Sequence, residues 1–261
     1  MAKEEKMLFI DVQGTLLKDS DKSPFEGACE LIELLNATQT PYVIITNNTK
    51  DLNFLASLRA KGLAIKEDAY IDPFLVLTRT LKPCKIAAFG SSEFKQALEE
   101  LGFKLEFKEP EAVAEASWDE FEFSEFATMI ELAKKGVRFV AMHETSIYKK
   151  GGRLYPGVGA IMAMIAYASE LRYEVIGKPS RAFYEAALRL LQIYKPSAEF
   201  SQVTIISDDY KGDLLGARAL GMKCALVLSG KLSDTKGLDT SILSATYKDI
   251  AGFLRAFKEG L

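Results

Sequence analysis

The feature that most constrains this chain is a set of four short polar segments, far apart in the sequence. Three of them follow an apolar run rich in β-branched residues, so buried strands would deliver their polar side chains to one end of a sheet. That end is where open α/β sheets bind their ligands. The four segments comprise residues 8–16, 43–48, 177–179 and 205–213.

Strand-like and helix-like patterns alternate along the chain, which predicts an α/β fold built on a parallel sheet with right-handed crossovers. Glycines that follow helical patterns, such as Gly62 and Gly136, are expected to end those helices. Apolar runs typical of strands cover 7–10, 42–45, 85–89, 137–141, 173–176, 203–206 and 223–228. Helical periodicity covers 28–35, 52–61, 93–101, 123–135, 159–171, 181–191 and 213–220.

The spacing of the segments indicates two structural units. About 130 residues separate Thr46 from Lys178, whereas the other segments follow one another closely. If all four segments share one site, most of the intervening chain must leave the core and return to it. We therefore expect a discontinuous core domain of residues 1–80 and 176–261 and an inserted α/β domain of residues 81–175.

Composition is that of an ordinary globular protein, with 261 residues of which 48% are hydrophobic. The 33 basic and 36 acidic residues form no basic stripe, which argues against a nucleic-acid partner. No apolar run reaches the ~18 residues of a membrane span, and the charged opening lacks a signal peptide, so we expect no membrane association. Three widely spaced cysteines suit a reducing compartment, so we expect a cytoplasmic protein.

The acidic fourth segment is the strongest local signal for chemistry. Asp208, Asp209 and Asp213 directly follow an apolar strand and would repel one another unless a cation neutralised them. Hard oxygen ligands favour Mg²⁺, although one or two of these residues could simply cap the helix that begins near Asp213. Asp11, at the end of the first strand, could be a metal ligand, a nucleophile toward phosphorus or a plain turn residue.

The remaining two segments carry groups that could hold a phosphate. Thr46 and Asn47 offer a hydroxyl and a backbone amide at a strand end, and the same residues also suit an ordinary turn. Lys178 could offset the repulsion between a carboxylate nucleophile and a phosphate dianion, or it could be a solvated lysine.

In this order, the four segments resemble the four motifs of the haloacid dehalogenase superfamily, over nearly the whole chain. Residues 156–160, 177–180 and 208–217 look like those of its NagD or 4-nitrophenylphosphatase-like branch. The resemblance implies a Rossmann-like core with an α/β cap domain inserted between the second and third motifs. In this branch the cap often mediates dimers, so a homodimer through the cap is expected.

The resemblance also implies a set of roles. Asp11 would be the nucleophile that forms an aspartyl-phosphate, and Thr46, Asn47 and Lys178 would hold the phosphoryl group. Mg²⁺ would be bound by Asp11, Asp208 and the backbone carbonyl of Gln13, with Asp209 and Asp213 acting through water or by orienting Lys178. The expected partner is a small phosphorylated metabolite.

Gln13 departs from the family pattern, because phosphatases of the family usually carry an acid–base aspartate two positions after the nucleophile. Such a group typically contributes ~10²–10⁴-fold in rate, and a glutamine amide cannot exchange a proton near neutral pH. The enzyme could be restricted to good leaving groups, could borrow an acid from the cap, or could bind a phosphorylated ligand without turnover. A weak or specialised phosphatase is the favoured interpretation.

His143 and Glu144 follow the apolar residues 139–142 at a strand end, where caps of this family place substrate-contacting residues. His143 is the only histidine of the chain, and it is a candidate for the missing acid or for a specificity role. A lone histidine beside an apolar strand is more often structural.

Overall fold

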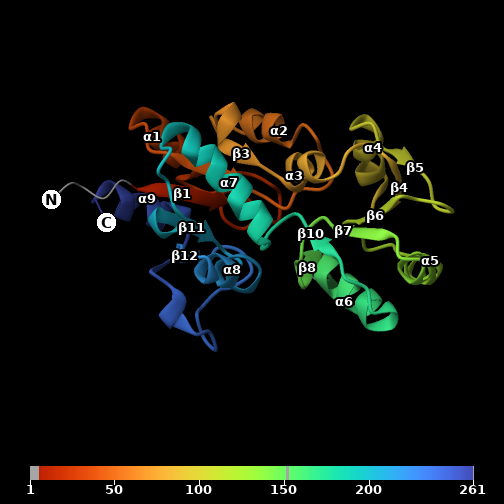
Figure 1. Ribbon diagram of the computed structural model, residues 1–261. Coiled ribbons are helices and arrows are strands. Elements are labelled where there is room, and N and C mark those ends of the chain that lie inside the picture. Colours follow the sequence, from red (N-terminus) through yellow and green to blue (C-terminus); the bar gives the residue numbers. More distant parts are fainter. Residues whose placement is uncertain (1–5, 151–152, 261) are drawn as a thin grey trace. The chain divides into compact units, whose positions relative to one another are not determined.

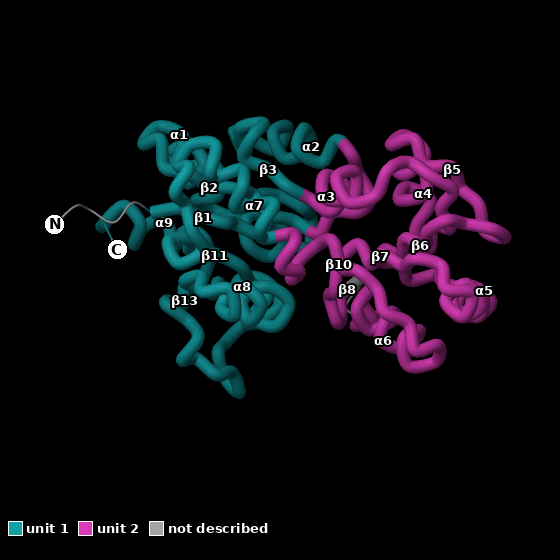
Figure 2. The backbone as a smooth tube through the Cα atoms, viewed as in Figure 1, with its two compact units in different colours: residues 1–46, 53–71, 184–261 teal, residues 47–52, 72–183 magenta. Residues whose placement is uncertain are grey.

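The computed structural model of the protein describes residues 6–150 and 153–260 (Figure 1). The chain forms two compact units, each built around its own parallel sheet (Figure 2). The first unit contains residues 1–46, 53–71 and 184–261, and the second contains residues 47–52 and 72–183.

The first unit is built on a six-stranded parallel sheet in the order β13-β12-β11-β1-β2-β3. From β1 the chain runs outward through β2 to β3, and β11 then returns to the opposite side of β1. The sheet therefore reverses its direction of winding between β1 and β11, the kind of position where ligands bind in doubly wound folds. The strands are β1 (Met7–Asp11), β2 (Tyr42–Ile45), β3 (Tyr70–Ile71), β11 (Val203–Ser207), β12 (Lys223–Val227) and β13 (Ala245–Tyr247).

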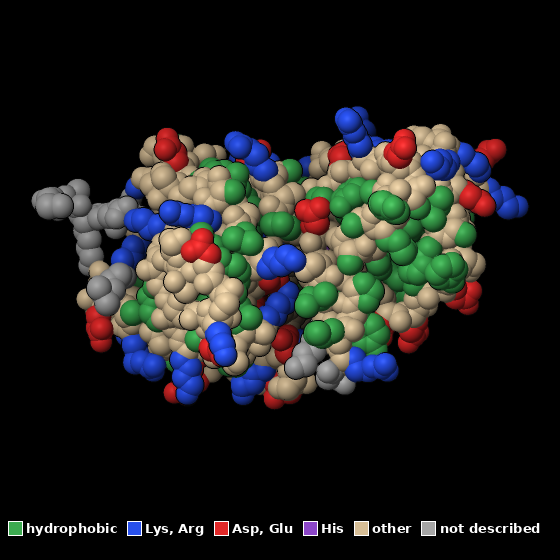
Figure 3. Space-filling view, turned by 90° about the horizontal axis from the view of Figure 1, so that it is seen from below, with side chains coloured by type: hydrophobic (Ala, Val, Ile, Leu, Met, Phe, Trp, Pro, Cys, Tyr) green, Lys and Arg blue, Asp and Glu red, His purple; other side chains and the backbone are tan. Residues whose placement is uncertain are grey.

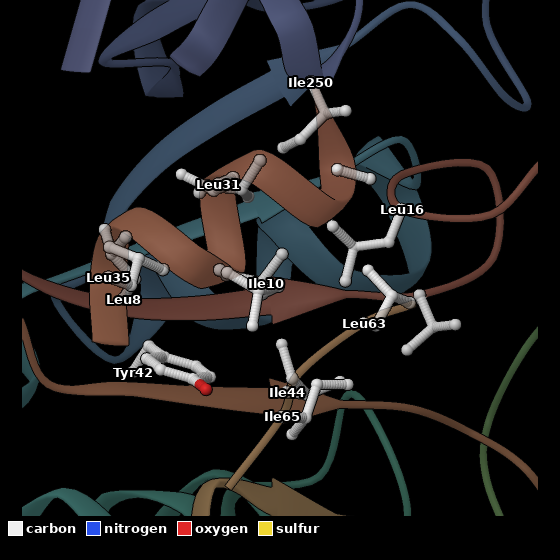
Figure 4. Close-up of a cluster of buried hydrophobic side chains, with 14 of the residues drawn as sticks. Leu8, Ile10, Leu16, Leu31, Leu35, Tyr42, Ile44, Leu63, Ile65 and Ile250 are labelled. Carbon is white, nitrogen blue, oxygen red and sulfur yellow. The ribbon is translucent and has the colours of Figure 1, made fainter. Parts of the chain in front are cut away.

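Helices cover both faces of this sheet. Leu8 and Ile10 of β1 point into a cluster with Leu31 of α1 and Ile250 of α9 (Figure 4). On the other face, the ring of Phe9 stacks on Tyr184 of α7, with 6.4 Å between the ring centroids. The helices of this unit are α1 (Ala28–Ala37), α2 (Phe54–Ala60), α7 (Arg181–Tyr194), α8 (Leu215–Ala219) and α9 (Ile250–Lys258). The first three residues of α7 are assigned to the second unit. A π-helical turn, η3 (Tyr210–Leu214), precedes α8.

The second unit has a five-stranded parallel sheet in the order β10-β7-β6-β4-β5 and a separate two-stranded antiparallel ribbon, β8-β9. Its winding direction reverses between β4 and β6. The strands are β4 (Lys85–Phe89), β5 (Lys104–Leu105), β6 (Ala112–Glu115), β7 (Arg138–Ala141), β8 (Ile147–Lys150), β9 (Arg153–Pro156) and β10 (Glu174–Val175). Its helices are α3 (Pro73–Thr80), α4 (Ser92–Glu100), α5 (Phe123–Lys134) and α6 (Val158–Ser169).

The structure confirms the predicted α/β class and all seven predicted strands, within one or two residues at their ends. Gly62 and Gly136 adopt the expected left-handed conformation, with φ of 93° and 77°. The sequence patterns missed strands β3, β5, β6 and β13, the two strands of the ribbon, and helices α3 and α9.

Two boundaries between the units, after residues 71 and 183, lie 9 and 8 residues from those expected from spacing, and residues 47–52 of the expected core belong to the second unit. Helix α3 belongs to the second unit, because Phe74 stacks on Phe94 of α4 with ring centroids 6.1 Å apart. Lys178 also belongs to the second unit, where its backbone is bonded to Asn47 and Glu144. The division thus follows contacts that join residues distant in sequence.

On the face shown in Figure 3, Lys and Arg side chains are interspersed with Asp and Glu. Among the described residues, no helix is long and apolar enough to cross a bilayer. All three cysteines are free thiols.

Candidate active site

The candidate site lies at the carboxyl edge of the first sheet, where β1 and β11 meet. In the strand register Asp11 is level with Ile45 of β2, and Ile10 is level with Ile206 of β11. Parallel pairing therefore brings Asp11, Thr46 and Asp208 to the same edge, each at or just beyond the end of its strand. This edge coincides with the reversal of winding between β1 and β11.

Thr15 connects Asp11 to the acidic segment. Its hydroxyl donates to Oδ2 of Asp11 over 3.3 Å and accepts from the main-chain amide of Asp208 over 3.2 Å. Thr15 is fully buried, and Asp11 is 6% exposed. One hydroxyl thus fixes the two carboxylate residues, which are 197 positions apart in the sequence.

Asp208 has one satisfied and one unsatisfied carboxylate oxygen. Its Oδ2 accepts the main-chain amide of Lys231 over 2.7 Å, whereas its Oδ1 is buried and has no hydrogen-bond partner among the described residues. Burial, followed by the charge of Asp11, raises the pKa of Asp208 well above its ordinary value. A bare buried oxygen beside a second carboxylate indicates a place for a cation.

Two glycines make room for this carboxylate. A Cβ at Gly14 would lie 2.3 Å from Oδ2 of Asp208, and a Cβ at Gly230 would lie 2.0 Å from the same atom. Gly14 also has φ of 75°, which favours glycine. The backbone must therefore approach Asp208 closely from two directions.

Asp209 and Asp213 are held by their own contacts within the loop. Asp209 caps the π-helical turn by accepting the Gly212 amide over 2.8 Å, and its other oxygen pairs with the ammonium of Lys231. Asp213 accepts the hydroxyl of Ser207 over 2.7 Å. The helix-capping alternative thus holds for Asp209. Hydrogen bonds to Gly212 and Ser207 hold the side chains of Asp209 and Asp213 in place.

Lys231 supplies the ammonium group that pairs with Asp209 in this loop. Burial lowers its pKa, but the charges of Asp209, Asp208 and Asp213 raise it by more, so the net shift is upward. Its ammonium therefore remains charged beside the acidic segment.

Asn47 and Lys178 lie in the second unit and are joined there, although they are 131 positions apart. Oδ1 of Asn47 accepts the Lys178 amide over 2.8 Å, and its Nδ2 donates to the Lys178 carbonyl over 3.3 Å. The Glu144 amide donates to the same carbonyl over 3.1 Å. Lys178 is 3% exposed. Because its main-chain amide and its carbonyl are both hydrogen-bonded, the backbone of the turn before α7 is fixed.

His143 is held inside the second unit. Its Nδ1 accepts the Thr145 amide over 3.3 Å, which leaves Nε2 as the protonated nitrogen that donates to Ser117 Oγ over 3.1 Å. The imidazole is 4% exposed. Glu144 is exposed and accepts the hydroxyl of Tyr173 over 3.2 Å.

The residues of the first unit suit Mg²⁺. Among the described residues, no three His, Cys, Asp or Glu side chains form a cluster of the kind that cages a metal. Mg²⁺ needs no such cage, because it keeps several waters and binds through one or two carboxylates. The unpartnered Oδ1 of Asp208, next to Asp11, meets that requirement.

Two family models match the chain, "Haloacid dehalogenase-like hydrolase" over residues 8–104 and "HAD-hyrolase-like" over residues 175–249. The chain belongs to the haloacid dehalogenase-like hydrolases. This membership confirms the family predicted from the four segments, and with it the prediction of an enzyme.

Relatives and solved structures agree with this assignment. The chain is 29% identical to bovine "Haloacid dehalogenase-like hydrolase domain-containing protein 2" over 230 residues, which cover 87% of the chain and 85% of the relative. It is 25% identical to "Acid sugar phosphatase" of Staphylococcus epidermidis over 253 residues, 94% of each protein. The structure of p-nitrophenyl phosphatase from Archaeoglobus fulgidus has the same fold, with a TM-score of 0.81, 21% identity, and coverage of 97% of this chain and 99% of that one.

This haloacid dehalogenase-like hydrolase has two site residues that the sequence patterns missed. Gly230 and Lys231 follow β12 at the same sheet edge; Lys231 bonds with Asp208 and Asp209, and Gly230 leaves the room that Asp208 needs. The signal was present, since they also come after an apolar strand. A Ser-Gly-Lys sequence is, however, ordinary turn composition.

A buried carboxyl in the second unit was also missed. Glu115 ends β6, where the second sheet reverses its winding, and neither of its oxygens has a hydrogen-bond partner among the described residues. Burial raises the pKa of Glu115 well above its ordinary value. A charged residue at the end of an apolar Ala-Val-Ala run was the available signal.

Proposed function

We propose that this hydrolase is a Mg²⁺-dependent phosphatase that releases phosphate from a small phosphorylated metabolite. The observation that carries the proposal is the buried, unpartnered Oδ1 of Asp208 beside Asp11 at the reversal point of the first sheet. The names of two relatives, an acid sugar phosphatase and a p-nitrophenyl phosphatase, support the same chemistry.

Asp11, Asp208 and the backbone carbonyl of Gln13 would hold the metal, and Asp209 and Asp213 would support it from outside. When bound, Mg²⁺ would offset the negative charge on the oxygens of the phosphoryl group. Thr46, Asn47 and Lys178 would bind those oxygens. Asn47 already holds the Lys178 backbone through two hydrogen bonds, so we assign it a positioning role as well.

Asp11 would act as the nucleophile. One of its carboxylate oxygens forms a bond to phosphorus, and the bond from phosphorus to the leaving-group oxygen breaks with its electron pair. Water then attacks the phosphorus of the aspartyl-phosphate, which releases inorganic phosphate and restores the Asp11 carboxylate. Thr15 keeps the carboxylate in one orientation through its hydrogen bond to Oδ2.

Gln13 cannot deliver a proton to the leaving group, so the proposal favours substrates whose leaving groups depart as stable anions, such as acyl or aryl phosphates. The same residue supports a second candidate, a protein that binds a phosphorylated ligand without turnover. A substrate-contacting role for His143 and Glu144 remains part of the proposal. So does a homodimer through the second unit, which sedimentation of the purified protein would test.

Phosphate release separates the two candidate functions. The purified protein should release phosphate from 4-nitrophenyl phosphate and acetyl phosphate with Mg²⁺ and not with a chelator, and Asp11→Asn should abolish release. Binding of phosphate by both proteins, with release by neither across a broad substrate panel, would favour the binding protein.

A further inference from the structure

The turn that follows Asp11 folds back on Gln13. The Gly14 amide donates to the Leu17 carbonyl over 2.8 Å, and Gln13 forms an isolated parallel bridge with Leu17. Leu17 forms a second, antiparallel bridge with Pro24. These contacts bring residues 18–23 beside Gln13.

Within this turn Lys22 has an unusual backbone conformation. Its φ is 57°, in the left-handed region that non-glycine residues seldom adopt. The Lys22 amide donates to the Lys18 carbonyl over 3.1 Å, and Asp21 accepts both the amide and the hydroxyl of Ser23. The local hydrogen bonds therefore hold Lys22 in a backbone conformation that is unfavourable for a non-glycine residue.

The side chain of Lys22 ends at Gln13. Its ammonium donates to Oε1 of Gln13 over 3.1 Å and to Oδ1 of Asp19 over 3.4 Å. An ammonium group only donates hydrogen bonds, so the Gln13 atom that faces it must be the carbonyl oxygen and not the NH₂ group. Lys22 thus selects one of the two orientations of the Gln13 amide and leaves its two N–H groups to donate elsewhere.

We propose that Lys22 is a positioning residue that orients the Gln13 amide as a hydrogen-bond donor to the leaving-group oxygen of the substrate. This inference rests on the proposed phosphatase function and defines its substrate class. A neutral N–H donor stabilises negative charge on the departing oxygen without transferring a proton. The Lys22–Gln13 pair therefore suits phosphate esters and anhydrides whose leaving groups are weakly basic anions.

The effect of Lys22 should grow with the basicity of the leaving group. More charge accumulates on the oxygen of a poor leaving group, so a hydrogen bond to it contributes more to the rate. The side chain of Lys22 is half exposed, and its ammonium also pairs with Asp19. Its contribution to the rate should therefore be no larger than that of a single hydrogen bond.

The test compares phenyl phosphate with 4-nitrophenyl phosphate in four proteins: the natural protein, Lys22→Met, Lys22→Arg and the control Lys18→Met. Lys18 lies in the same turn, and its side chain forms no hydrogen bond with Gln13. Lys22→Met should lower kcat for phenyl phosphate by about 3- to 10-fold, the range of one hydrogen bond, with little change in KM and a smaller loss for 4-nitrophenyl phosphate. Lys22→Arg, which also only donates, should restore the rate, and Lys18→Met should match the natural protein.

A double-mutant cycle shows whether Lys22 acts through Gln13. In a Gln13→Met background, Lys22→Met should have no further effect, because there is no amide left to orient. Equal losses on both substrates, no loss on either, or an undiminished effect in the Gln13→Met background would overturn the inference and leave the phosphatase proposal standing. A natural protein that releases no phosphate from either substrate or from acetyl phosphate would overturn both.

Discussion

The main-chain amide of Lys231 donates a 2.7 Å hydrogen bond to Oδ2 of Asp208, while Oδ1 of the same carboxylate is buried without a partner. One oxygen is thus fixed by the protein and the other is left bare, within reach of the negative charge of Asp11. Such an arrangement is costly in the absence of a cation, because two carboxylates repel each other in a poorly solvated place.

Mg²⁺ should therefore stabilise the protein. At a concentration about 100 times its Kd it should raise the free energy of unfolding by about 2.7 kcal/mol, provided it binds only the folded state. Asp208→Asn should remove this gain while making the metal-free protein no less stable, because it relieves the repulsion with Asp11. Denaturant unfolding with and without Mg²⁺ measures both effects, and an equal gain in the variant would show that the ion binds elsewhere.

Gly230→Ala should displace Asp208. The added Cβ would lie 2.0 Å from Oδ2 of Asp208 and 2.8 Å from the Cα of Gly14, so the carboxylate has to move. We expect Mg²⁺ affinity, measured by titration calorimetry, to fall at least about tenfold, comparable to the loss of a supporting group around a metal ligand. Gly252→Ala is the matched control, because its Cβ would have no neighbour closer than 3.5 Å and its place in α9 favours alanine. Unchanged affinity in Gly230→Ala would contradict the described loop geometry.

Glu115 should make the stability of the second unit depend on pH. Burial raises its folded-state pKa above the unfolded value of about 4.5, so the folded form retains the proton more strongly. Below the unfolded-state pKa, Glu115 is protonated in both states and does not lower the free energy of unfolding. Above that pKa, the free energy of unfolding falls by about 1.4 kcal/mol per pH unit, until the folded-state pKa is reached.

Glu115→Gln, which stays neutral, should accordingly be as stable as the natural protein near pH 4 and more stable at pH 7.5. Thermal unfolding of both proteins across this range measures the difference. Glu120→Gln, at an exposed position, is the control and should show no such divergence. A constant difference at all pH values would mean that burial does not raise the pKa of Glu115 in the folded protein.

Gln13→Asp should restore a group that can transfer a proton. If lost proton transfer is the only consequence of Gln13, hydrolysis of alkyl phosphates should rise more than that of 4-nitrophenyl phosphate, whose leaving group needs less protonation. The ratio of kcat/KM for the two substrate types reports this directly. Equal gains on both would count against the account of Gln13.

Much of this site could be predicted from the sequence because its residues follow long apolar strands. Asp11 and Asp208 each end a run of buried residues, and parallel pairing brings such ends together whatever the order of the strands. Two of the strands that escaped prediction, Tyr70–Ile71 and Lys104–Leu105, are too short to show a period of two.

Other features depend on contacts between distant residues, which no local pattern contains. Asn47 belongs to the second unit because it forms hydrogen bonds with Lys178. Helix α3 belongs to the same unit because Phe74 packs on Phe94. The role of Lys22 depends on a left-handed φ that its residue type does not favour.

In the proposed reaction, Asp11 carries the phosphoryl group during turnover. Rapid acid quenching of the protein during Mg²⁺-dependent turnover of acetyl phosphate, followed by mass spectrometry, tests it most directly. We expect a peptide containing Asp11 that is heavier by one phosphoryl group, and no such peptide in Asp11→Asn. Phosphate release without a phosphorylated Asp11 peptide, or with the phosphoryl group on another residue, would show that Asp11 is not the nucleophile.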